Sequence, residues 1–315
     1  MRTLVRSTAP HAARWRPRRP SVGTVVIALL SLAGLVLLLY PGTAAWISQY
    51  RQSLNIIDYD AAVATAGPAT LREELELARA YNATLAGRAV VGAGSNVPVS
   101  LDSGGADAFS YERLLASDSE GIMGRIQIPA IDVDLPIAHG TSEATLLKSV
   151  GHLRGTSLPV GGLGSRAVLT AHRGLASARL FTDLDQVREG DRFTLAVAGE
   201  VFTYEVIRTQ VVAPTDTETL LPEPDRDLVT LVTCTPLGVN THRILVTGER
   251  IEPTPASDIA AASAPPEVPR FPWWAVALGG GLLAIGAFVW TDGFRGGQGR
   301  DRRAGGSAGT GSAAT

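Results

Sequence analysis

Residues 228–236 read Leu-Val-Thr-Leu-Val-Thr-Cys-Thr-Pro, and residues 237–248 continue Leu-Gly-Val-Asn-Thr-His-Arg-Ile-Leu-Val-Thr-Gly. The β-branched, apolar run before Cys234 is typical of a mostly buried strand. A proline and a glycine interrupt that run, and extended chain resumes from Arg243. We therefore expect an antiparallel hairpin in which Cys234 ends the first strand and Arg243 begins the second. A thiol and a guanidinium would then lie on neighbouring strands at one rim.

Cysteine occurs only once in the 315 residues. This excludes an intramolecular disulfide and any CxxC or cysteine-rich metal site. A formal net charge of −2 indicates no particular class of partner. Between the two apolar runs described next, the sequence contains neither a glycine-rich nucleotide-binding signature nor a metal-ligand cluster, so we expect no cofactor and no metal.

A basic arm, residues 1–21, contains six arginines and no acidic residue, and it precedes the uncharged apolar run 22–40. A run of this length is sufficient to span a bilayer, and the positive flank remains in the cytoplasm. A cleaved signal peptide is the alternative, because small residues follow at 43–45, but the apolar run is long for one. Nucleic-acid binding by the arm is a weaker reading, and we expect no nucleic-acid partner.

A second apolar run, residues 271–290, has tryptophans at both ends and arginines after it. Aromatic residues at both ends are typical of a membrane span. Two crossings place both termini in the cytoplasm and residues 42–270 outside, which predicts a multi-pass protein of the cell membrane. The predicted organisation is a cytoplasmic basic arm (1–21), a transmembrane helix (22–40), an extracellular segment with a helical stalk (41–120), a strand-rich domain (121–252), a Pro/Ala-rich spacer (253–270), a transmembrane helix (271–290) and a cytoplasmic tail (291–315).

Within the extracellular part, Thr70 to Glu73 resembles a capping box that opens a helix reaching about Ala86. From Gly121 onward the pattern changes to short strands separated by turns, which favours an all-β sandwich or barrel. Short helical connections are expected at 141–149 and 178–186. The predicted strands are 124–128, 133–137, 167–170, 192–197, 201–212, 228–233 and 243–251.

A cysteine nucleophile needs a proton acceptor and a group that stabilises charge on the attacked carbonyl. His172 closes a predicted strand in the same way that Cys234 closes its own, which makes it the preferred base. His139 and His152 flank turns and are read as polar turn residues, whereas His242 is a fallback base. From spacing alone, an inert buried cysteine remains the simpler reading.

Six segments of the sequence resemble motifs of one known protein family. Segments 169–174, 230–236 and 240–243 look like the three catalytic motifs of sortases, and segments 137–142, 151–162 and 180–184 resemble class C sortases, which polymerise pilins. The resemblance implies the closed eight-stranded sortase β-barrel. With the helices expected above, the predicted fold is all-β with short helices, an N-terminal helix and two transmembrane helices. It also implies that Cys234 is the nucleophile, His172 the general acid/base and Arg243 the oxyanion or substrate clamp. Attraction between the Cys234 thiolate and the His172 imidazolium would support the reactive form.

The implied substrate is an LPXTG-like sorting signal on a secreted pilin or surface protein. It is cleaved between Thr and Gly through a thioacyl enzyme and transferred to a pilin lysine, which assembles pili. Class C enzymes often carry a lid with an Asp-Pro-aromatic motif, and Asp107-Ala108-Phe109 matches it at two of three positions. We expect Asp107 to contact Arg243 and Phe109 to contact Cys234. The alternatives are a sortase that anchors proteins to the cell wall and, from a different class, an inactive sortase-like scaffold for pilins.

Overall fold

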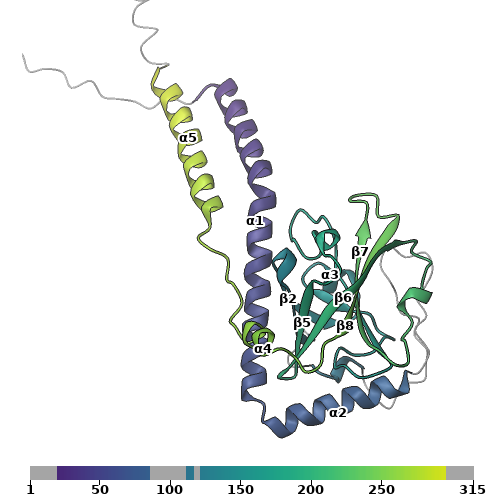
Figure 1. The fold of residues 1–315 in the computed structure, drawn as a ribbon. Helices are drawn as coiled ribbons and strands as arrows, with labels where there is room; N and C mark the ends of the chain where they lie inside the picture. Colours follow the sequence, from purple (N-terminus) through teal and green to yellow (C-terminus); the bar gives the residue numbers. More distant parts are fainter. Residues whose placement is uncertain (1–19, 86–110, 117–120, 296–315) are drawn as a thin grey trace, which may run out of the picture. The chain divides into compact units, whose positions relative to one another are not determined.

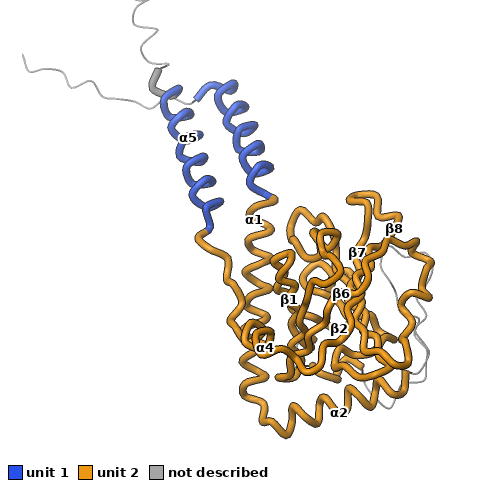
Figure 2. The backbone as a smooth tube through the Cα atoms, viewed as in Figure 1, with its two compact units in different colours: residues 1–40, 272–315 blue, residues 41–271 orange. Residues whose placement is uncertain are grey.

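The structure is a computed structural model that describes residues 20–85, 111–116 and 121–295. The chain divides into two compact units (Figure 2). One unit comprises residues 1–40 and 272–315, and the other comprises residues 41–271. The larger unit contains the β-barrel and every residue of the candidate site that the structure describes.

The larger unit is built around a closed barrel with strand order β1-β2-β3-β4-β7-β8-β6-β5, as Figure 1 shows in part. The strands are β1 (Ile122–Ile128), β2 (Val133–His139), β3 (Val150–His152), β4 (Ser165–Thr170), β5 (Arg192–Val197), β6 (Glu200–Val212), β7 (Asp227–Thr235) and β8 (His242–Arg250). The closed eight-stranded barrel predicted from the sequence is confirmed.

The two central strands, β4 and β7, run parallel and are covered on both faces. Leu169 and Leu231 face the main core, and Val168 and Val232 face a smaller apolar cluster on the other side. Parallel strands covered on both faces carry nearly continuous apolar sequence. This burial explains why the run before Cys234 is apolar throughout rather than alternating.

The short strand β3 is absent from the strands predicted by sequence. It has three residues, pairs in parallel with β2 and antiparallel with β4, and completes the barrel between them. A strand of this length has no measurable periodicity, because its conformation is imposed by its two neighbours. The seven other strands occur where the sequence predicts them, with ends shifted by a few residues.

Two helices of the larger unit cover the barrel. The second half of α1 (Val22–Thr65) buries Ile56 and Tyr59. The Tyr59 hydroxyl accepts from the Ala198 amide at 2.9 Å and donates to the Met123 carbonyl at 3.3 Å.

Helix α2 (Pro68–Thr84) packs Leu75, Ala78 and Tyr81 into the main core. The predicted capping box at Thr70 is wrong, because the helix begins with Pro68, whose fixed φ suits a first helical position.

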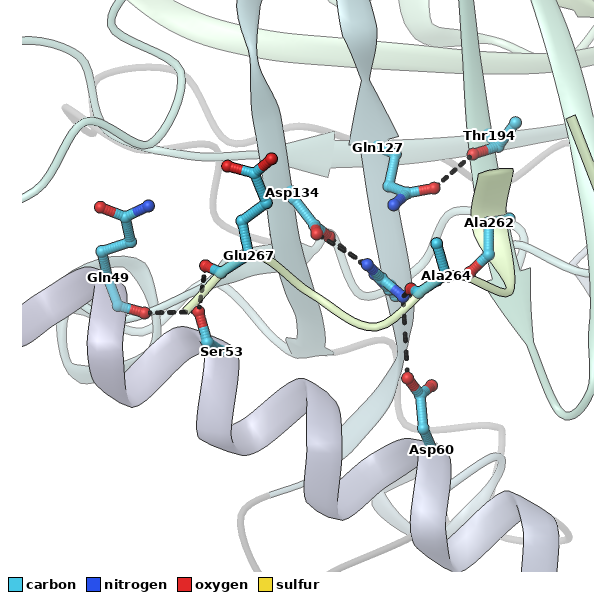
Figure 3. Close-up of polar contacts among 10 residues, drawn as sticks. Gln49, Ser53, Asp60, Gln127, Asp134, Thr194, Ala262, Ala264 and Glu267 are labelled. Atoms are coloured by element: carbon cyan, nitrogen blue, oxygen red, sulfur yellow. Dashed lines mark hydrogen bonds and ion pairs between the residues drawn. The ribbon is translucent and has the colours of Figure 1, made fainter. Parts of the chain in front are cut away.

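The segment predicted as a spacer, 253–270, contains a helix, α4 (Ala256–Ala262), and contacts the barrel through a buried arginine. The Arg125 side chain is 2% exposed, and its Nε and Nη2 donate to the two Asp134 carboxylate oxygens at 2.6 and 2.7 Å (Figure 3). Its Nη1 donates to the carbonyls of Ala262 and Ala264 at 3.2 and 2.9 Å and lies 3.6 Å from Asp60 of α1. One guanidinium therefore joins the barrel, α1 and the C-terminal segment.

The smaller unit contains the first half of α1 and helix α5 (Trp273–Arg295). In the part of the chain that the structure describes, these two helices are long and apolar enough to cross a membrane, by length and composition. Within this unit, a Cβ atom at Gly281 would lie 2.4 Å from a Leu35 methyl group, so glycine permits the two helices to pack closely there. Thr24 Oγ1 donates to the Asp292 carboxylate at 2.6 Å.

Candidate active site

The parallel pairing of β4 and β7 brings His172 and Cys234 to the same rim of the barrel. The register pairs Thr170 with Val232, and His172 and Cys234 each lie two residues further along their own strands. Because parallel strands end at the same edge of a sheet, the two residues reach that edge together. The sequence predicts both as strand-end residues, and the register adds that their strands are neighbours.

The antiparallel pairing of β7 and β8 brings Arg243 to the same place. Cys234 and Arg243 are directly opposite each other in the register, and residues 236–241 form the connecting loop. Side chains alternate along a strand. Cys234 therefore shares its face with Val232, and Arg243 shares its face with Leu245, both members of the smaller apolar cluster. The strand order β4-β7-β8 places the thiol between the imidazole-bearing and guanidinium-bearing strands.

Hydrogen bonds beyond the last ladder pair fix the end of β4 against β7. The Ala171 amide donates to the Val232 carbonyl at 3.2 Å, and the Thr233 hydroxyl donates to the Ala171 carbonyl at 2.8 Å. The His172 carbonyl accepts from the Phe181 amide at 3.1 Å. The backbone that carries His172 is therefore held on both sides of the residue.

A glycine permits the loops after β4 and β7 to approach each other. Gly174 has a φ of +75°, and a Cβ atom there would lie 2.3 Å from Leu237 Cδ2. The left-handed backbone conformation favours glycine at this position, and a larger residue would also require Leu237 to move. The glycine of the sequence motif after His172 is thus explained by packing against the loop that follows Cys234.

Arg243 is buried at the rim, with 5% of its surface exposed. Its Nη1 donates to the carbonyls of Asn240 and His242 at 2.9 and 3.0 Å. Asn240 has a φ of 59°, a left-handed conformation that asparagine tolerates better than most residues. The loop itself thus orients the guanidinium.

Cys234 is half-buried, and burial raises the pKa of its thiol, with the nearby Arg243 charge acting in the opposite direction. Burial is the larger of the two effects, and it disfavours the charged thiolate. The expectation that attraction to the His172 imidazolium would support the reactive thiolate stays a prediction.

A carboxylate that the sequence analysis did not identify faces His172. Nε2 of His172 lies 3.5 Å from Oε1 of Glu143, the first residue of the short helix α3 (Glu143–Leu146). The sequence predicts a helical connection at this place but assigns no role to Glu143. Its proximity to His172 depends on the long-range packing of the β2–β3 connection, so only the serine cap before it was visible as a local signal.

The other histidines of the larger unit have different surroundings. His152 is fully buried, and its Nδ1 and Nε2 lie 2.8 Å from the Tyr111 hydroxyl and the Ser157 carbonyl, respectively. Burial lowers the pKa of His152 to about 4. The two nitrogens of His139 each lie 2.8 Å from a backbone carbonyl. The interpretation of His139 and His152 as polar turn residues is therefore wrong, because both join strands to neighbouring segments. His242 is exposed beside Thr241.

Asp107 and Phe109 lie outside the described residues. Among the residues that are described, no group of three or more His, Cys, Asp or Glu side chains is arranged to hold a metal ion. The described rim brings together the thiol of Cys234, the imidazole of His172, the guanidinium of Arg243 and the carboxylate of Glu143.

Comparison with known proteins agrees with this arrangement. A model of the sortase domain matches residues 126–251. Sortase D of Bacillus subtilis (strain 168) is 30% identical over 131 residues, which cover 41% of this chain and 63% of that protein. The chain spans less than two thirds of the length of the curated relatives it matches.

Two solved structures are more similar in sequence. A lid mutant of sortase A from Corynebacterium diphtheriae is 41% identical, with a TM-score of 0.53 over 60% of this chain and 97% of that one. Sortase C of Streptococcus pneumoniae is 39% identical, with a TM-score of 0.55 over 62% and 95% of the two chains. Sortases are cysteine transpeptidases, which is the enzyme class predicted from the sequence. The chain belongs to the sortase family through a sortase domain at residues 126–251.

Proposed function

We propose that the chain is a membrane-anchored cysteine transpeptidase that acts on an LPXTG-like sorting signal and transfers it to an amine. One observation carries the proposal: the strand register brings Cys234 opposite Arg243 and level with the end of the strand that leads to His172. In this proposal Cys234 is the nucleophile, His172 the general acid/base and Arg243 the group that stabilises charge on the attacked carbonyl.

The reaction divides into an acylation and a transfer. His172 takes the proton of Cys234, and the sulfur attacks the carbonyl carbon of the Thr–Gly bond, whose oxygen becomes negative next to Arg243. The C–N bond then breaks as His172 gives its proton to the leaving amine, which leaves a thioacyl enzyme. An incoming amine attacks the thioester, loses its proton to His172 and expels the Cys234 thiolate. Arginine suits the charge-stabilising position because it stays protonated and offers several donors in a fixed geometry.

The acceptor amine distinguishes two forms of this proposal. A pilin lysine as acceptor would make the chain a class C, pilus-assembling sortase. This form is supported by the class C-like segments 137–142, 151–162 and 180–184, and by the likeness to Streptococcus pneumoniae sortase C, whose structure is described in terms of pilin substrate specificity. The alternative, anchoring surface proteins to the cell wall, is favoured by curated relatives that carry the names sortase A and sortase D.

We propose further that the two apolar helices cross the cell membrane and that both basic termini are cytoplasmic. The larger unit, residues 41–271, would then be extracellular, where secreted substrates are available. The arginines outside both runs support this orientation. The bilayer and LPXTG-bearing proteins are accordingly the partners that we propose.

The segment Asp107-Ala108-Phe109 completes the proposal as a lid, with Asp107 directed to Arg243 and Phe109 to Cys234. The likeness to a solved sortase described as a lid mutant supports a lid in this chain. Removing both side chains, by Asp107→Ala with Phe109→Ala, should raise peptide turnover and the alkylation rate of Cys234. Unchanged values of both would argue against the lid.

The proposal is tested by incubating the full chain in detergent with a candidate pilin and an LPXTG peptide, alongside Cys234→Ala. Lysine-linked ladders of the pilin would identify a polymerase. Transfer to wall-type amines without ladders would identify an anchoring enzyme. Equal activity of wild type and Cys234→Ala would refute both forms, and complete inactivity with a bound pilin would favour the inactive scaffold.

A further inference from the structure

The imidazole of His172 has one ring nitrogen that faces a carboxylate. Its Nε2 is buried and lies 3.5 Å from Oε1 of Glu143. It makes no hydrogen bond to any residue that the structure describes, at ordinary bond lengths. The side chain of His172 is 21% exposed and that of Glu143 is 69% exposed. The pair therefore lies at the solvent boundary of the rim, with the nitrogen inside and the carboxylate outside.

The backbone position of Glu143 is fixed independently of this pair. Ser142 caps α3 by accepting from the Thr145 amide at 3.2 Å, and the side chain of Leu146 is 1% exposed. Gly151 of β3 permits the close packing of α3, because a Cβ atom there would lie 2.8 Å from Leu146 Cδ2 of that helix and would also overlap the Gly140 carbonyl oxygen just before it. The close packing of α3 on β3 therefore places Glu143 at the rim, and this placement does not depend on attraction to His172.

We propose that Glu143 is a positioning residue for His172. This inference rests on the proposed function, in which His172 exchanges protons with Cys234 and the leaving amine. With Nε2 directed to the carboxylate, Nδ1 is the nitrogen that accepts the Cys234 proton. The imidazolium formed in that step then has its Nε2–H facing Glu143, which stabilises the positive charge. The proton on Nδ1 passes to the leaving amine, and Glu143 keeps its own charge throughout.

Because Glu143 is exposed, its replacement should change the catalytic rate rather than the stability of the fold. An exposed ion pair contributes little to folding stability. Orientation and charge stabilisation of a general acid/base instead act on the chemical step, where acid–base catalysis as a whole supplies about 10²–10⁴-fold. We expect the removal of Glu143 to lose part of this rate enhancement, so that kcat falls about ten-fold and KM changes little.

The test compares Glu143→Gln, Glu143→Asp and His172→Ala in the full chain in detergent. The control is Glu218→Gln, because Glu218 is also an exposed glutamate in the first turn of a short helix, η4 (Glu218–Leu220). The readouts are kcat and KM for transfer of an LPXTG peptide to an amine, thermal stability, and the ¹⁵N chemical shifts of the His172 ring, which report which nitrogen carries the proton.

The expected result is that Glu143→Gln lowers kcat about ten-fold and redistributes the ring proton between the nitrogens, without changing thermal stability. Glu143→Asp should recover part of the loss, and Glu218→Gln should match wild type. Wild-type kcat and wild-type ring shifts in Glu143→Gln, with His172→Ala inactive, would overturn the inference and leave the proposed function intact. Activity in His172→Ala equal to wild type would instead overturn the proposed function itself.

Discussion

Replacing Thr233 by valine tests whether the alignment of β4 and β7 matters for the chemistry. Valine has nearly the shape of threonine but lacks the hydroxyl that donates to the Ala171 carbonyl at 2.8 Å. Both residues are buried, at 1% and 3% exposure, so water does not readily replace the lost donor. A buried carbonyl that loses its donor costs about 1–3 kcal/mol. We expect the free energy of unfolding to fall by about this amount.

The same change should affect catalysis more than stability alone explains. The lost bond holds the residue immediately before His172, and misplacing a catalytic group by about 1 Å can reduce a rate 10²-fold. We expect kcat for LPXTG peptide transfer to fall at least about ten-fold in Thr233→Val, with KM nearly unchanged.

The matched control for Thr233→Val is Thr247→Val. Thr247 is a buried threonine of β8 whose hydroxyl lies 3.3 Å from that of Thr230, away from the rim. It should lose stability and keep kcat. Wild-type kcat in Thr233→Val, or an equal loss of kcat in Thr247→Val, would refute the reasoning.

Three further changes have defined outcomes. Arg125→Ala should lower the free energy of unfolding by about 3–5 kcal/mol in urea titrations, because it breaks a buried ion pair, whereas the exposed Arg192→Ala should cost at most about 1 kcal/mol. Similar losses in both would contradict the buried network. Gly151→Ala should lower the melting temperature and kcat together, since its Cβ would overlap a backbone oxygen. The rate of Cys234 alkylation should increase at a higher pH than the rate for an ordinary thiol, because burial raises the pKa of Cys234. Arg243→Gln should slow alkylation at neutral pH, because it removes the charge that lowers this pKa. Alkylation that is already maximal at neutral pH would contradict this.

The barrel was predictable from sequence wherever burial left a local signal. Strand β7, which carries Cys234 next to its end, is covered on both faces, so its apolar run is continuous and bounded by a proline. The helix expected from residue 70 to about 86 is present as α2, and its buried residues Leu75, Ala78 and Tyr81 lie at helical spacing. The start of that helix was misplaced, because a proline at the first helical position competed with a plausible capping box.

The remaining features depend on contacts between distant segments. Strand β3 exists only because its neighbours pair with it, and Arg125 lies in a predicted strand where nothing local indicates burial among α1 and the C-terminal segment. Cys234, His172 and Arg243 were found as strand-end residues, but their shared rim follows from the pairing of β4, β7 and β8. Glu143 was missed because its partner is 29 residues further along the chain.

The central claim is that Cys234 becomes acylated by a sorting signal with the help of His172 and Arg243. The most direct measurement is mass spectrometry of the full chain after brief incubation with an LPXTG peptide, in wild type, His172→Ala and Arg243→Ala. The account predicts a threonine-ended acyl adduct on Cys234 in the wild type and a strongly reduced adduct in both variants. Cleavage of the peptide without any adduct on Cys234, or undiminished adduct in both variants, would contradict it.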